Sequence, residues 1–152
     1  MRRPDRPGPA RPILLVLSGV CDGSRGPGGW GYVSCDSSGV ERAGHGTVPE
    51  TTSNRMELQA VIEGLRSLGN KARLTPVRVV TASQYLVEGA TGKRERSANT
   101  DLWAKLDAEL RKRPVTWEWE PPNTMLYQAQ AHALARQALK RALGSGPPGQ
   151  LQ

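Results

Sequence analysis

Apolar residues follow a strand-like pattern in the first part of the chain. Residues 13–18 form an apolar run that ends in a serine and has the length of a strand buried on both faces. Residues 30–35 predict a second strand and residues 40–48 a weaker third, with turns in the glycine-rich segment 23–29 and at 37–39. Short strands joined by tight connections predict an antiparallel meander.

The pattern changes to helical spacing after residue 53. Apolar residues then recur at intervals of three and four before a glycine: Leu58, Val61, Ile62, Leu65, Leu68 and Gly69. Asn54 is the expected N-cap of this helix, and Glu57 occupies the capping-box position three residues later. The rest of the chain predicts a strand at 77–81, a helix at 83–90, a helix from 99 or 100 to 110, a strand at 115–119 and an alanine-rich helix at 126–143.

This order of elements, β-β-β-α-β-α-α-β-α, predicts an α/β fold. A strand that returns through a helix to another strand implies a parallel pair, so the meander is extended by parallel strands. We expect a mixed five-stranded sheet flanked by helices, formed by a single domain at 13–143. Residues 1–12, rich in Pro and Arg, are expected to be a disordered basic tail, and residues 144–152 a flexible C-terminal tail.

The charge balance favours an anionic partner. The chain has 21 Lys and Arg against 14 Asp and Glu, a net charge of +7 and a pI of about 10.0. Such a balance is typical of proteins that bind nucleic acid or an anionic surface, although arginine-rich composition alone produces the same numbers. The apolar runs are too short for a membrane span, so no membrane association is expected.

The two cysteines, Cys21 and Cys35, do not form a CxxC pair, and the two histidines are distant in sequence. This excludes the usual zinc-site patterns and a disulfide framework. Reduced thiols are typical of a cytoplasmic protein, which is the expected location.

Six segments, in order, resemble type 1 ribonuclease H. They are GPGGWG at 26–31, TTSNRMEL at 51–58, SQY at 83–85, DLW at 101–103, WEW at 117–119 and LAR at 134–136. The resemblance covers roughly 13–140 and implies the ribonuclease-H-like fold, in agreement with the order of elements deduced above. It also implies two-metal hydrolysis of phosphodiesters, in which two Mg²⁺ ions are held by four carboxylates.

The resemblance assigns these four carboxylate positions to Ser18, Glu57, Ala82 and His132. Only Glu57 is a carboxylate. An alanine side chain cannot bind a metal, serine is a poor Mg²⁺ ligand, and histidine prefers softer ions. The loop after the WEW segment, which carries a histidine in many members, reads EPPNTM and contains none. We therefore expect an inactive site without a bound metal or other cofactor.

Two alternatives concern individual residues of this site. Asp22 begins a DGS tripeptide that usually marks the first carboxylate, so a shortened turn would bring it into the site. Glu57 is either a remaining weak metal ligand or simply the capping partner of Asn54. His132 as a zinc ligand is disfavoured against a polar position on a helix surface.

The resemblance also implies contacts to the minor groove of an RNA/DNA hybrid, at positions that match Gly19, Asn54 and Gln84, with Thr52 near a phosphate. Asn54 and Gln84 have equally plausible local roles at helix starts. The basic extra helix of many members is missing, because only fifteen residues separate Tyr85 from Asp101. Lys93, Arg94 and Arg96 are its possible remnant.

Three functions follow from these observations. The first is an inactive domain that binds an RNA/DNA hybrid or double-stranded RNA by shape and phosphate contacts. The second is a protein-interaction scaffold, with an apolar surface near Leu126 or Tyr127. The third is a nuclease with a rebuilt site that uses Asp22, Glu57 and His132 with Mg²⁺ or Mn²⁺ and cuts the RNA strand of hybrids. The sequence does not indicate the oligomeric state.

Overall fold

The computed structural model describes residues 11–69 and 75–144, so most of the expected tails at 1–12 and 144–152 lies outside the described residues. The predicted order of elements is confirmed. The elements are β1 (Ile13–Cys21), β2 (Gly26–Cys35), β3 (Glu41–Thr51), α1 (Ser53–Ser67), β4 (Val77–Thr81), α2 (Gln84–Thr91), α3 (Thr100–Leu110), β5 (Val115–Trp119) and α4 (Leu126–Gly144).

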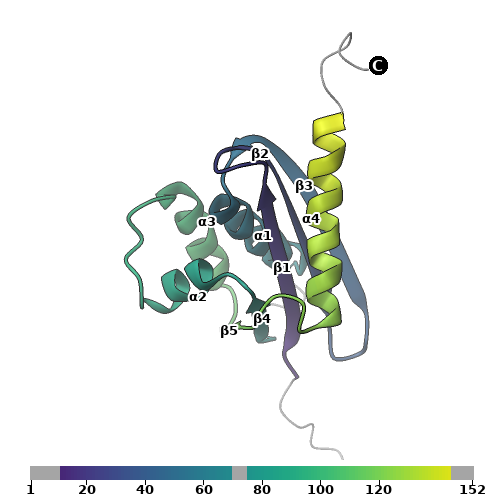
Figure 1. Cartoon of the computed structure of the whole chain (residues 1–152). Coiled ribbons are helices and arrows are strands. Elements are labelled where there is room, and N and C mark those ends of the chain that lie inside the picture. Colours follow the sequence, from purple (N-terminus) through teal and green to yellow (C-terminus); the bar gives the residue numbers. More distant parts are fainter. Residues whose placement is uncertain (1–10, 70–74, 145–152) are drawn as a thin grey trace, which may run out of the picture.

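The strands form one mixed sheet in the order β3-β2-β1-β4-β5 (Figure 1). β1, β2 and β3 are antiparallel, whereas β4 pairs with both β1 and β5 in parallel. The mixed five-stranded sheet predicted from the sequence is therefore confirmed. The parallel pairing of β1 with β4 matters for the site, because it brings the ends of these two strands to the same part of the sheet.

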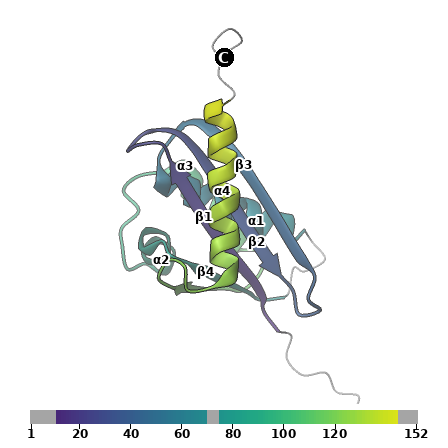
Figure 2. The same ribbon diagram turned by 45° about the vertical axis from the view of Figure 1, so that its right-hand side comes forward.

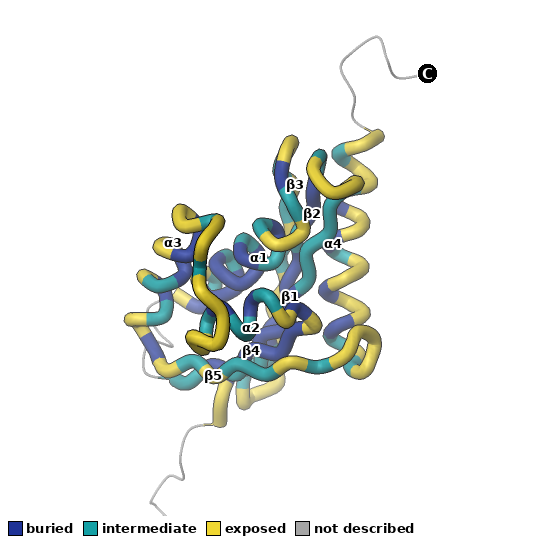
Figure 3. The backbone as a smooth tube through the Cα atoms, turned by 60° about the vertical axis from the view of Figure 1, so that its left-hand side comes forward, coloured by how far each residue is buried: buried dark blue, intermediate teal, exposed yellow. Residues whose placement is uncertain are grey.

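Helices cover the two faces of the sheet unequally. α4 packs on β1, β2 and β3, while α1 packs on the opposite face together with α2 and α3 (Figures 1 and 2). Most of the core lies on the α1 side, and Figure 3 shows buried segments along the sheet and in α1. Its fully buried side chains include Leu15, Leu58, Ile62, Leu65, Val79 and Leu106. A smaller cluster of Val16, Val33, Val80 and Ala131 lies under α4.

Only the first part of the glycine-rich segment 23–29 is a turn, which corrects the sequence prediction for 26–29. The turn occupies residues 22–25, and 26–29 already belong to β2. A Cβ atom on Gly29 would lie 2.3 Å from the carbonyl oxygen of Ala135, and one on Gly31 would lie 2.7 Å from that of Ala131. These glycines therefore serve close packing of α4 on the sheet.

The start of α1 also differs from the prediction. Thr52, with extended backbone angles, is the N-cap, and its hydroxyl accepts a hydrogen bond from the Arg55 backbone N–H at 3.3 Å. Asn54 is a residue of the first turn and Glu57 lies beyond the capping-box position. The predicted capping role of Asn54 and Glu57 is therefore wrong, because both threonine and asparagine are good N-caps and the backbone selects Thr52.

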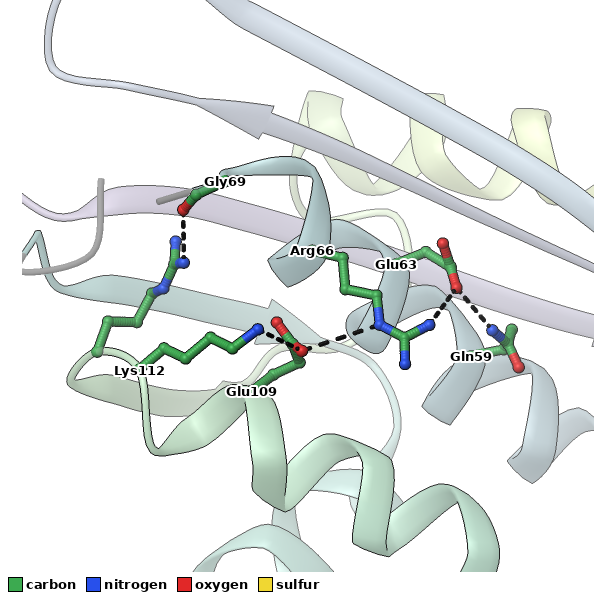
Figure 4. A network of polar contacts seen from close by, with 7 residues as sticks. Gln59, Glu63, Arg66, Gly69, Glu109 and Lys112 are labelled. Carbon is green, nitrogen blue, oxygen red and sulfur yellow. Dashed lines mark hydrogen bonds and ion pairs between the residues drawn. The ribbon is translucent and has the colours of Figure 1, made fainter. Parts of the chain in front are cut away.

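A polar network joins α1 to α3 on the side away from α4 (Figure 4). The buried Glu109 carboxylate accepts from Lys112 Nζ at 3.0 Å and lies 3.8 Å from Arg66 Nε. Arg66 also donates to Glu63 at 3.2 Å, and Gln59 donates to the same carboxylate at 3.0 Å. The network provides the buried carboxylate of α3 with counter-charges, as burial requires.

Among the described residues, none of the helices has both the length and the apolar character needed to cross a membrane. Cys21 and Cys35 are free thiols.

Candidate functional site

Ser18 lies where β1, the end of β4 and α4 meet. Val16 pairs with Val80 in the parallel register, so Ser18 and Ala82 each follow this pair by two residues. From the α4 side, His132 approaches β1, and its Nδ1 lies 3.1 Å from Ser18 Oγ. The structure thus joins two of the four positions assigned from the resemblance by a direct hydrogen bond, and places a third near them.

Asp22 does not take the position of Ser18. β1 continues to Cys21, and Asp22 follows in the exposed turn, where its backbone N–H donates to Pro27 at 2.8 Å. Asp22 lies four residue steps beyond Ser18, which along an extended strand is a distance of about 13 Å. The alternative in which a shortened turn brings Asp22 into the site is therefore not the arrangement found.

Glu57 approaches from α1 on the other face of β1. A Cβ atom on Gly19 would lie 2.5 Å from the Glu57 backbone nitrogen, so the glycine allows α1 to contact β1 directly. The Oε2 atom of Glu57 is buried without a hydrogen-bond partner among the described residues. Burial raises the pKa of Glu57 from its usual 4.5 to about 7, and a hydrogen bond with the Ser83 side chain opposes this effect.

We expect Glu57→Gln to make the protein more stable at pH 8 and less sensitive to pH. The folded state holds this proton more tightly than the unfolded state does. The stabilisation is therefore complete below about pH 4.5 and is lost as the pH rises through about 7. Its upper limit is about 3 kcal/mol.

Urea unfolding of both proteins at pH 5 and pH 8 measures this difference. A wild-type protein whose free energy of unfolding changes with pH no more than that of the variant would contradict the raised pKa.

Ala82 follows β4 and is exposed. Its carbonyl accepts a hydrogen bond from Trp119 Nε1 at 2.9 Å. The Trp119 ring, at the end of β5, is 41% exposed. An apolar methyl group and an aromatic side chain thus lie at the end of β4, where the resemblance implies a metal-binding carboxylate.

The loop between β5 and α4 is attached to the helix through Gln128. Gln128 Oε1 accepts from the backbone N–H groups of Thr124 and Met125 at 2.9 and 3.1 Å, and from the Thr124 hydroxyl at 2.9 Å. Gln128 is the third residue of α4, so its bond to Met125 is half of a capping box. Gln128 was not among the residues predicted from the sequence, although a Gln three positions after an N-cap is a readable signal.

The residues at the four positions do not fit two Mg²⁺ ions. Within 11–69 and 75–144, no group of three His, Cys, Asp or Glu side chains is arranged to hold a metal. Glu57 is the one carboxylate of the four, and the His132 nitrogen that faces β1 is hydrogen-bonded to Ser18. Two divalent cations need several oxygen ligands to offset their repulsion, and this arrangement lacks them.

The positions assigned to nucleic-acid contacts lie close to this centre. Gly19 touches α1 at Glu57, and Thr52 caps the same helix. Asn54 and Gln84 are exposed in the first turns of α1 and α2. These two side chains can reach a ligand, whereas the Thr52 hydroxyl is already engaged by the Arg55 N–H.

Most of the charge of the possible basic remnant is neutralised locally. Arg94 pairs with Glu88 at 2.8 Å, and Arg96 pairs with Asp107 at 2.7 Å. The Arg96 guanidinium also lies 4.3 Å from the centre of the Trp103 ring. This segment therefore holds α2 against α3 more than it offers free charge to a ligand.

The apolar surface expected near Leu126 and Tyr127 is limited to Leu126, which is 73% exposed, because Tyr127 packs against the smaller core cluster.

Comparison with known proteins identifies the fold and the family. A model of the RNase H family matches residues 13–140. Ribonuclease H of Bordetella pertussis is 35% identical over 156 residues, covering 90% of this chain and 95% of that protein. Ribonuclease H of Pseudomonas entomophila is 39% identical over 120 residues, covering 70% and 78%.

Solved structures of RNase H proteins have the same fold as this chain. A crystal structure of LC11-RNase H1 in complex with an RNA/DNA hybrid superposes with a TM-score of 0.78 at 27% identity, over 86% of this chain and 99% of that one. The N-terminal RNase H domain of a Mycobacterium tuberculosis protein shares the fold with a TM-score of 0.76 at 23% identity, over 88% and 96%. With 35–39% identity to ribonucleases H and a family match over nearly the whole described fold, this chain belongs to the RNase H family.

Proposed function

We propose that this chain binds an RNA/DNA hybrid or double-stranded RNA and does not hydrolyse it. The observation that carries the proposal is the 3.1 Å hydrogen bond between Ser18 Oγ and His132 Nδ1. It links two neutral or cationic groups at positions where the resemblance implies two metal-binding carboxylates. With Ala82 at a third position, the site has no means of holding two Mg²⁺ ions.

Loss of the metals removes catalysis but leaves the means of binding. Recognition of duplex RNA relies on shape and on contacts to phosphates and 2′-hydroxyls, which require no metal. The net charge of +7 favours such contacts, and the exposed Asn54 and Gln84 lie within three residues of Glu57 and Ala82 along the chain. LC11-RNase H1, a structural neighbour, was crystallised with an RNA/DNA hybrid, which supports a ligand of the same class.

The free thiols of Cys21 and Cys35 support a cytoplasmic location.

The test combines binding and cleavage in one titration. A labelled RNA/DNA hybrid is incubated with the protein in Mg²⁺ and in Mn²⁺, and anisotropy and strand length are read from the same samples. We expect binding that weakens steeply with salt and no shortening of the RNA strand. The double variant Asn54→Ala/Gln84→Ala is expected to bind roughly tenfold more weakly, because two polar contacts are removed.

The other outcomes identify the alternatives. Cleavage that disappears in Glu57→Gln would contradict the proposal and indicate a rebuilt metal site. Absence of binding at low salt would also contradict it and would favour a protein partner, for which the exposed Leu126 is the first surface to test.

A further inference from the structure

A groove of about 830 Å³ runs along α4, beside the end of β1. Its walls are apolar at Val20 on β1 and at Leu139 and Leu143 on α4. The groove adjoins the Ser18–His132 pair, since His132 is itself a lining residue. The groove thus continues from the site already described toward the C-terminal end of α4, whose length along the sheet is seen in Figure 2.

The charged residues of this groove have one sign. The cations Arg136 and Lys140 line it together with the imidazole of His132, and no carboxylate does so among the described residues. They are spaced by four residues and all three are exposed, so they form one row on the helix. α4 contains no Asp or Glu, and neither Arg136 nor Lys140 takes part in an ion pair within the described ranges.

We propose that this groove binds the phosphate backbone of nucleic acid directly, without a bridging metal, through His132, Arg136 and Lys140. The inference rests on the proposed function and extends it to a particular surface and a particular mode of binding. The row spans eight residues of helix, about 12 Å. That is the axial length of about three to four nucleotides of one strand.

Metal-free phosphate binding follows from the predicted replacement of carboxylates at this site by neutral or basic side chains. Carboxylates repel a phosphate and need metal cations between them and the substrate. A histidine at position 132, followed by Arg136 and Lys140, attracts the phosphate instead. Ser18 holds the ring of His132 through Nδ1, so the other ring nitrogen is directed away from Ser18. Divalent metal ions are therefore unnecessary for binding along this groove.

Two features favour nucleic acid over other anionic partners: the positive charge of the groove and its continuity with the candidate site. The groove includes His132, which is hydrogen-bonded to Ser18 of the candidate site, so a ligand bound along α4 can extend to that site. The apolar walls at Val20 and Leu139 suit the ribose faces of a strand, while Arg136 and Lys140 follow its phosphates. An acidic peptide and an anionic membrane share only the charge, and they are included in the test as competitors.

The experiment measures binding of a labelled RNA/DNA hybrid by anisotropy in EDTA, over a range of salt concentrations. The groove variant Arg136→Glu/Lys140→Glu is compared with a matched variant, Lys105→Glu/Arg111→Glu. The matched variant makes the same change of charge at two exposed residues, one on α3 and one just after it, on the face of the sheet opposite α4. We expect the groove variant to bind at least about tenfold more weakly and to lower the slope of log affinity against log salt by about two. The matched variant should bind within about threefold of wild type, as expected for charges that make no phosphate contact.

Each result separates the two proposals. A wild-type protein that binds no hybrid contradicts the proposed function itself. If wild type binds and both double variants weaken binding equally, nucleic acid is bound but the groove is not its site. Hybrid binding that requires Mg²⁺ also overturns the inference. So does a result in which polyglutamate or phosphatidylserine vesicles bind through Arg136 and Lys140 and the hybrid does not. Circular dichroism of each variant confirms that it is folded.

Discussion

The triple variant Ser18→Asp/Ala82→Asp/His132→Asp is expected to cleave the RNA strand of an RNA/DNA hybrid in Mg²⁺. Together with Glu57, it has a carboxylate at each of the four positions that the resemblance assigns to the metal ligands. A two-metal site lowers the barrier by several kcal/mol, so the rate should rise by at least about 1,000-fold over wild type. Gel analysis of labelled RNA, with and without EDTA, measures the change.

The matched control adds Glu57→Gln to the triple variant and should abolish the restored cleavage. Single replacements at Ser18, Ala82 or His132 should restore little activity, because a pair of metal ions depends on the whole set of ligands. A folded triple variant that binds the hybrid but leaves it intact would show that the backbone, and not only the side chains, has moved away from a catalytic geometry.

Gly29→Ala is expected to produce the largest loss of stability for a single added methyl group. The new Cβ atom would lie 2.3 Å from the carbonyl oxygen of Ala135 and 2.9 Å from the backbone nitrogen of Leu139. Both atoms belong to the backbone of α4, so the helix must move as a whole. Overpacking of this kind costs about 3 kcal/mol. For a domain of this size we expect a decrease in Tm of roughly 10 °C by thermal unfolding.

Gly144→Ala is the control for this substitution. It makes the same chemical change at the end of the same helix, with no neighbouring atom within 4 Å of the new Cβ. Its Tm should remain within a few degrees of wild type, because a helical alanine is favoured over glycine by about 1 kcal/mol. Equal Tm values for wild type and Gly29→Ala would mean that α4 tolerates a shift without loss of packing. A shift of α4 should also weaken hybrid binding, because His132 and Arg136 move with the helix.

The sequence by itself determined the order of the elements and the family. Periods of two and of three to four are local properties of the chain, so strands such as Val77–Thr81 and helices such as α1 were readable from the spacing of apolar residues. The sequence also predicts the four positions of the site, since ordered motifs lie on each side of Ser18, Ala82 and His132. That these residues replace metal-binding carboxylates stays a prediction from the resemblance.

Only the tertiary structure decided what these residues do now. The bond between Ser18 and His132 joins residues 114 positions apart, and no local pattern reports such a contact. The glycines at 26–29 resembled a turn, but the approach of α4 places them in β2. Glu57 resembled a capping residue, but packing of α1 against Gly19 buries it and raises its pKa. In each case the deciding energy is a steric, desolvation or hydrogen-bond term between distant segments, which exists only once the chain is folded.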